Sequence, residues 1–171
     1  LHGWLAAEQP DIDCLQEAKL EDHAVPQQGS VAAGYHVAFS GQKTYNGVAL
    51  LARETPSDVV FGNPLHAEQQ KRLVAATIGG ICVVCAYVPN GQAVGSDKYA
   101  YKLAWLDALT RWLKGRLAAN PRLVVAGDFN IAPHEDDVWS HRQLLDVVSH
   151  TPVETEALDS LLTGNHGWVD L

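Results

Sequence analysis

Short hydrophobic runs recur along most of the chain, and their spacing predicts more strands than helices. Apolar or alternating runs of about four to eight residues, bounded by Gly, Pro, Asn or Asp, are typical of strands. On this criterion we expect strands at residues 11–16, 35–40, 48–53, 58–61, 73–78, 81–87 and 123–126. Asn46-Gly47 and Gly79-Gly80 are typical turn sequences, and they predict hairpins between the strands that flank them.

A longer hydrophobic period predicts helices in three places. Residues 1–8 look like the later part of a helix that ends at Pro10. Residues 99–118 repeat leucine every three or four positions, after Ser96 or Asp97 as the N-cap. Residues 151–154 place Thr at the cap, Pro at the first position and Glu at the third, which starts a helix reaching about residue 162. Few helices among many adjacent strands predict a layered α/β domain with a largely antiparallel or mixed sheet.

Composition agrees with one globular domain. The chain has 171 residues, of which 47% are hydrophobic and 19% are charged. No apolar run approaches the roughly 20 residues of a membrane span, so we expect no membrane association. Three cysteines without a disulfide pattern fit a reducing compartment, so we expect a cytoplasmic protein. We also expect a monomer. The net charge of −8 argues against bulk electrostatic binding of nucleic acid, but it is compatible with acidic residues gathered around a divalent cation.

Both ends of the sequence look like cuts. The chain has no methionine, and it starts inside an apparent helix. Residues 167–171 look like the beginning of a strand. We therefore expect a single domain over residues 1–171, truncated at both ends.

Polar side chains of the catalytic kind follow three of the predicted buried strands. Glu17 follows the first, Tyr87 and Asn90 end the sixth, and Asp128 and Asn130 follow the seventh. Sheets present functional groups at strand ends, and carboxylate oxygens such as those of Glu17 and Asp128 suit a divalent cation. A phosphodiester hydrolase also needs a base for water and donors at the phosphate. Taken singly, each of these residues is more often explained by a solvated loop, by packing or by a turn or cap.

Five segments together resemble one known family. They are Leu15-Gln16-Glu17-Ala18-Lys19, residues 41–51 (GQKTYNGVALL), Gln70-Lys71-Arg72, Tyr87-Val88-Pro89-Asn90-Gly91 and residues 127–133 (GDFNIAP). In order and spacing they are similar to the motifs of the exonuclease III / AP endonuclease family, within the endonuclease/exonuclease/phosphatase superfamily. Residues 41–43 and 127–133 favour this branch over the lipid and inositol phosphatases of the superfamily.

The resemblance implies a fold, a reaction and a set of roles. The fold is a DNase I-like, four-layer αββα sandwich, here incomplete at both ends. Glu17 would bind a catalytic Mg²⁺ or Mn²⁺, Asp128 would orient or deprotonate the attacking water, and Asn130 would position it. Tyr87 would hydrogen-bond the phosphate or leaving group, and Asn90 would contact the DNA backbone. Apart from the resemblance, the basic candidates for a DNA-facing surface are Lys43, Lys71, Arg72, Lys98 and Lys102, each of which is equally explained as a solvated side chain.

The implied substrate is double-stranded DNA with abasic sites or 3′ ends, cleaved by endonuclease and 3′-to-5′ exonuclease action. Two departures stand out: Ala18 replaces a common Thr, and the family's N-terminal Asn and C-terminal S-D-H motif are absent from these residues. We therefore expect the isolated 171-residue chain to be inactive or very weak. Two alternatives remain open: a superfamily phosphoesterase acting on RNA or a small phosphate ester, and a non-catalytic nucleic-acid-binding relative.

Overall fold

The described part of the chain divides into two compact units. The computed structural model describes residues 1–21, 27–67, 69–163 and 168–169. The first unit comprises residues 1–62, 68–87 and 120–128, and the second comprises residues 63–67, 88–119 and 129–171. The strand predicted at residues 167–171 falls largely outside the described residues, and Trp168 and Val169 are not in a strand.

Two sheets form the first unit, and they contain all seven predicted strands within one or two residues of the predicted bounds. The three-stranded antiparallel sheet has the order β1 (Ile12–Gln16), β3 (Val48–Ala52), β2 (His36–Ser40). The four-stranded sheet has the order β4 (Ser57–Phe61), β5 (Leu73–Ile78), β6 (Ile81–Tyr87), β7 (Leu123–Asp128). Its β4, β5 and β6 are antiparallel, whereas β6 and β7 are parallel, so the predicted mixed sheet is confirmed.

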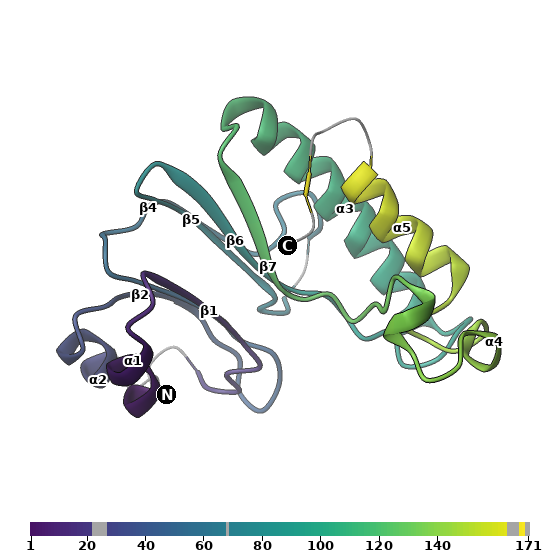
Figure 1. Cartoon of the computed structure of the whole chain (residues 1–171), viewed down its shortest axis with the longest axis horizontal. Coiled ribbons are helices and arrows are strands. Elements are labelled where there is room, and N and C mark those ends of the chain that lie inside the picture. The colour runs from purple at the N-terminus through teal and green to yellow at the C-terminus, as the bar shows by residue number, and fades with distance from the viewer. Residues whose placement is uncertain (22–26, 68, 164–167, 170–171) are drawn as a thin grey trace. The chain divides into compact units, whose positions relative to one another are not determined.

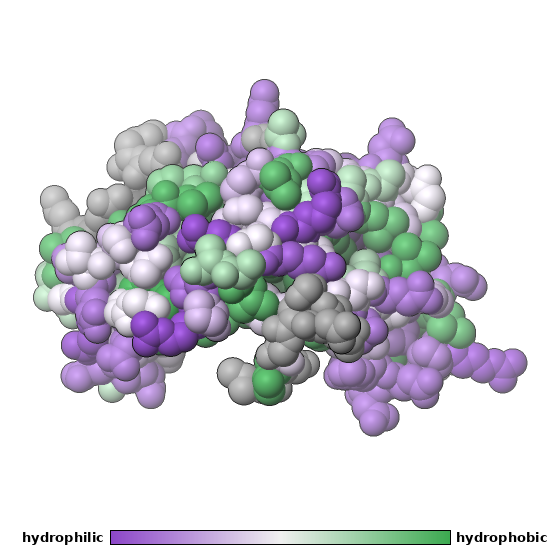
Figure 2. Space-filling model, turned by 90° about the horizontal axis from the view of Figure 1, so that it is seen from above, coloured by the Kyte–Doolittle hydropathy of each residue, from purple (hydrophilic) through white to green (hydrophobic). Residues whose placement is uncertain are grey.

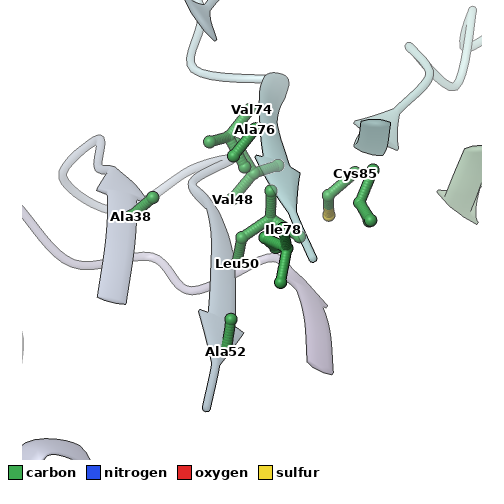
Figure 3. Packing of buried hydrophobic residues seen from close by; sticks show 9 residues of the cluster. Ala38, Val48, Leu50, Ala52, Val74, Ala76, Ile78 and Cys85 are labelled. Carbon is green, nitrogen blue, oxygen red and sulfur yellow. The ribbon is translucent and has the colours of Figure 1, made fainter. Parts of the chain in front are cut away.

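Apolar side chains fill the space between the two sheets (Figure 3). Val48, Leu50 and Ala52 of β3 alternate inward and meet Val74, Ala76 and Ile78 of β5, because side chains of a strand point to one face at every second residue. Cys85 of β6 belongs to the same cluster; its Sγ accepts a hydrogen bond from Gln16 Nε2 at 3.2 Å and donates one to the Leu15 carbonyl at 3.5 Å. All three cysteines are free.

Two short helices cover the outer face of the three-stranded sheet (Figure 1). They are α1 (His2–Glu8) and α2 (Gln27–Ala32). Leu5 of α1 packs with Tyr35, Ala49 and Leu51, all at most 3% exposed. The first unit therefore has one helical layer and two sheet layers.

Helices make up most of the second unit. The long α3 (Asp97–Ala119) and α5 (Pro152–Thr163) lie side by side (Figure 1), and the shorter elements are a 3₁₀ turn, η2 (Glu135–Asp137), and α4 (His141–Leu144). Leu106, Leu109 and Leu113 of α3 are at most 1% exposed, which confirms most of the predicted leucine stripe. The predicted capping box of α5 is also present, since Glu154 N donates to Thr151 Oγ1 at 3.3 Å and Thr151 N donates to Glu154 Oε2 at 3.2 Å.

Ser96 is the N-cap of α3, and its loss should destabilise the protein. Its Oγ accepts a hydrogen bond from Tyr99 N at 3.1 Å. We expect Ser96→Ala to lower the free energy of unfolding by about 1 kcal/mol, measured by urea denaturation of the full-length protein. Ser140 is the matched control, because it precedes α4 without a side-chain cap bond, so Ser140→Ala should change little. Equal losses for the two variants would contradict this account of the cap.

None of the described helices is long and apolar enough to cross a membrane. On the face drawn in Figure 2, hydrophobic residues are scattered among hydrophilic ones.

Candidate active site

Glu17 and Tyr87 meet where strands of the two sheets of the first unit end. Glu17 directly follows β1 and Tyr87 is the last residue of β6. Tyr87 Oη donates a hydrogen bond to Glu17 Oε1 at 2.7 Å, and Lys19 Nζ lies 2.7 Å from Glu17 Oε2. Two residues separated by 70 positions in the sequence therefore share one polar cluster.

A rigid loop holds the Glu17 carboxylate in place. Glu17 and Lys19 both have left-handed backbone conformations, with φ of 53° and 54°, which non-glycine residues adopt only when the surroundings impose them. The surroundings are the loop at residues 41–47: Ala18 N donates to the Gly47 carbonyl at 3.2 Å and Lys19 N donates to the Asn46 carbonyl at 3.0 Å.

Gln42 organises that bracing loop, which the sequence alone did not indicate. Its Oε1 accepts hydrogen bonds from Asn46 Nδ2 at 2.8 Å and from Lys71 N at 3.2 Å. Lys71 O in turn accepts a hydrogen bond from Gly47 N at 2.9 Å. The motif at residues 41–47 thus supports the candidate metal ligand through main-chain contacts. Lys43, predicted to contact DNA, is exposed on the same loop.

The charges of this cluster favour an ionised carboxylate beside a protonated phenol. The hydrogen bond from Lys19, and then that from Tyr87, hold the pKa of Glu17 below its usual value. Partial burial, followed by the hydrogen bond to Glu17, raises the pKa of Tyr87 above its usual value. Near neutral pH, Glu17 is an anion available to a cation, and Tyr87 keeps its proton and acts as a donor.

Arg72 fixes the Tyr87 ring. Its guanidinium carbon lies 4.7 Å from the ring centroid, and its Nη1 donates to the Tyr87 carbonyl at 3.3 Å. The main chains are also joined, since Tyr87 N donates to Arg72 O at 2.7 Å. Arg72 therefore contacts the candidate site through Tyr87. The sequence predicts a DNA contact for Arg72 but not this one.

Asp128 lies at the end of β7, the strand that pairs with the strand of Tyr87. The two residues are register partners at the ends of the parallel strands β6 and β7. The negative charge of Asp128 is among the smaller causes that raise the pKa of Tyr87. Asp128 is exposed. The first unit thus brings Glu17, Tyr87 and Asp128 to neighbouring strand ends.

Gly127, the residue before Asp128, lies where β7 approaches β6 closely. A side chain at position 127 should not be tolerated. The φ of Gly127 is +137°, and a Cβ would lie 1.9 Å from the Ala86 carbonyl oxygen. We expect Gly127→Ala to lower the free energy of unfolding by about 2 kcal/mol or more, measured by urea denaturation. Gly115→Ala is the control, because a Cβ at Gly115 of α3 would meet no atom within 4 Å. This control should be neutral or slightly stabilising, and a neutral Gly127→Ala would overturn the explanation.

Asn90 and Asn130 pair with each other in the second unit. Asn90 Nδ2 donates to Asn130 Oδ1 at 3.2 Å, and Asn130 Nδ2 donates to the Val88 carbonyl at 2.9 Å. Asn130 has a left-handed φ of 51°. The two amides predicted to handle phosphate and water are therefore oriented by one another and by the main chain.

The donor set of the first unit suits a hard divalent cation. The described residues contain no group of three or more His, Cys, Asp and Glu side chains of the kind that encloses a metal ion. Mg²⁺, however, is commonly held by one or two carboxylates together with water and substrate phosphate. An ionised, half-exposed Glu17 with Asp128 on a neighbouring strand end fits that mode of binding.

Comparison with known proteins places the chain in a family. The model of the Endonuclease/Exonuclease/phosphatase family matches residues 1–168, and the chain belongs to this family. The predicted DNase I-like α/β sandwich and the predicted resemblance to the exonuclease III / AP endonuclease branch are confirmed by the similar proteins.

Three of these similar proteins illustrate the match. Exodeoxyribonuclease III of Haemophilus influenzae is 33% identical over 136 residues, which cover 76% of this chain and 51% of that protein. A 3′ phosphatase from Neisseria bound to a product DNA hairpin has a TM-score of 0.91 and 39% identity, covering 94% of this chain and 63% of the other. An AP endonuclease from Archaeoglobus fulgidus has a TM-score of 0.88 and 40% identity, covering 95% and 63%. The chain thus spans about half the length of the curated exodeoxyribonuclease III that it matches.

Proposed function

We propose that this chain belongs to a DNA-repair nuclease that hydrolyses phosphodiester bonds in duplex DNA with a divalent cation, Mg²⁺ or Mn²⁺. The observation that carries the proposal is the cluster of Glu17, Tyr87 and Asp128 at neighbouring strand ends of a family member. We infer further that residues 1–171 form one domain of this family, since the family model runs through both compact units.

Each residue of the cluster has a proposed task. Glu17 would hold the cation, which when bound neutralises charge on the phosphoryl oxygens. Asp128 accepts a proton from the attacking water as the general base. Tyr87, protonated and held by Arg72, donates a hydrogen bond to the phosphate or leaving group. Asn130 orients the water.

The substrate would be double-stranded DNA at abasic sites and at 3′ ends. Asn90 and Lys43 would contact the sugar-phosphate backbone, and Arg72 would add positive charge beside Tyr87. We propose a monomer that acts in the cytoplasm, where three free cysteines are stable.

The proposal is tested by substrate comparison with the full-length protein. It is incubated with Mg²⁺, Mn²⁺ or excess chelator and with four substrates: an abasic-site duplex, a recessed 3′-end duplex, a matched RNA duplex and p-nitrophenyl phosphate. Metal-dependent cleavage of the two DNA duplexes is expected. Preference for RNA or the small ester would indicate another phosphoesterase, and binding of DNA without cleavage under any condition would indicate a non-catalytic relative.

A further inference from the structure

A fully buried ion pair lies beneath the two paired asparagines. Lys102 of α3 and Glu154 of α5 form a salt bridge, and both side chains are 0% exposed. Charged side chains are rarely buried completely, because removal from water is costly unless partners compensate it. The partners of this pair therefore indicate what it does.

Lys102 binds the main chain of both asparagines. Its Nζ donates to the Asn130 carbonyl at 2.7 Å and to the Asn90 carbonyl at 3.2 Å, in addition to Glu154 Oε1. One ammonium group thus joins two segments that lie 40 positions apart and whose side chains hydrogen-bond to each other. Gly91 lies close against this side chain, since a Cβ there would lie 3.1 Å from Lys102 Cδ.

Glu154 holds the other side of the same segment. Its Oε1 and Oε2 accept hydrogen bonds from Ser149 N at 3.0 and 2.9 Å. Ser149 O in turn accepts a hydrogen bond from Ala132 N at 2.8 Å, and the ring Nδ1 of His150 lies 2.7 Å from the Ala132 carbonyl oxygen. Residues 130–132 are therefore fixed at Asn130 by Lys102 and at Ala132 by Ser149 and His150, just before α5.

The backbone is left-handed at two residues of this hydrogen-bonded network. Asn130 and Ser149 have left-handed φ values of 51° and 76°. Residues in this region revert to lower-energy conformations unless surrounding contacts hold them. A buried ion pair contributes little net stability compared with a well-packed apolar pair, so stability alone does not account for its presence here.

We infer that Lys102 and Glu154 are positioning residues that hold Asn130 and Asn90 in the geometry needed for phosphate and water. The inference rests on the proposed function and deepens it. Neither residue would touch the substrate. Lys102 holds the main-chain carbonyls of the two asparagines, and Glu154 holds Lys102. With the main chain held, the side-chain amides of Asn90 and Asn130 hydrogen-bond to each other in one arrangement.

The test separates positioning from folding by neutralising both members of the pair at once. Lys102→Met alone leaves a buried carboxylate unpaired, so it should destabilise the protein strongly. The double variant Lys102→Met with Glu154→Gln removes both charges, and Gln can still serve the capping box. We therefore expect its melting temperature to return close to that of the wild type. Lys114→Met, at an exposed position of the same helix, is the control for substitution in α3.

The expected kinetic result concerns turnover. In the full-length protein, the double variant should lose about 10- to 100-fold in kcat on an abasic-site duplex, with KM changed by less than about threefold, because misplaced groups lower the rate more than binding. Recovery of kcat together with the melting temperature would mean that the pair is merely structural, and would overturn the inference.

A readout that needs no activity separates this inference from the proposed function. In amide NMR spectra, the side-chain amide signals of Asn90 and Asn130 should shift in the double variant and stay in place in Lys114→Met. Unchanged signals would overturn the positioning role. If the wild-type protein cleaves no DNA, the proposed nuclease function fails, and these spectra still decide whether the pair positions the asparagines.

Discussion

Asp128→Asn should lower the turnover of the full-length protein on an abasic-site duplex by about 10²- to 10⁴-fold, the usual contribution of a general base. The amide has the size of the carboxylate but cannot accept a proton from water. Asp128 is exposed at the end of β7, so the substitution should leave the fold unchanged. The measurement is single-turnover incision at saturating Mg²⁺, with circular dichroism and thermal unfolding as checks of the fold.

Asp146→Asn is the matched control for this experiment, because Asp146 is an exposed aspartate that is not a member of the candidate cluster. It should retain wild-type turnover. If Asp128→Asn cleaves within threefold of the wild-type rate, Asp128 is not the base, and the roles assigned to the first unit would have to be redistributed.

Glu17→Gln should reduce activity by about 100-fold or more, because an interaction with a metal ion at the reacting phosphate is worth several kcal/mol. Gln keeps an oxygen that can accept the Tyr87 hydrogen bond, but it has no charge for the cation. The diagnostic measurement is a Mg²⁺ titration, in which half-maximal activity should require much more metal than in the wild type. Glu8→Gln, an exposed substitution on α1, should leave the titration unchanged.

The pH dependence gives a second check on Glu17. Its pKa lies below the ordinary glutamate value, so the carboxylate stays ionised as the pH falls from 7 to about 5. The Mg²⁺ concentration that gives half-maximal activity should therefore stay nearly constant over this interval. A requirement that rises steeply across it would argue that another group, with a higher pKa, is the principal ligand.

Much of the fold could be predicted because its strands follow simple rules. Residues 48–52 form a continuous apolar run, and all five are buried in β3. Gly79 and Gly80 both have the positive φ that a tight hairpin turn needs. The short α2 and α4 could not be predicted, since residues 27–32 and 141–144 contain too few apolar positions to define a helical period. Such helices depend on tertiary packing.

The strand-end residues of the candidate site could be proposed from the sequence, whereas the residues that support them could not. Glu17, Tyr87 and Asp128 were named because they follow buried strands, and the structure brings them together. Lys102 was a candidate for the DNA-facing surface, and its complete burial shows that this was wrong; a charged residue is normally assigned to the solvated face of a helix. The signal was present: Lys102 lies in the stripe that contains Tyr99, Leu106 and Leu109.

The contact between Gln16 and Cys85 links a buried residue to the candidate site. Gln16 Nε2 and Cys85 Sγ lie 3.2 Å apart. Cys85 is two residues before Tyr87 and Gln16 is one residue before Glu17, so this contact lies next to the 2.7 Å hydrogen bond from Tyr87 Oη to Glu17 Oε1. Protein interiors are close-packed, and a change of one methyl group is transmitted to neighbouring atoms. A conservative exchange at Cys85, which is 0% exposed, should therefore change the distance between Tyr87 Oη and Glu17 Oε1, so an interior position that solvent does not reach can tune the geometry of the candidate site.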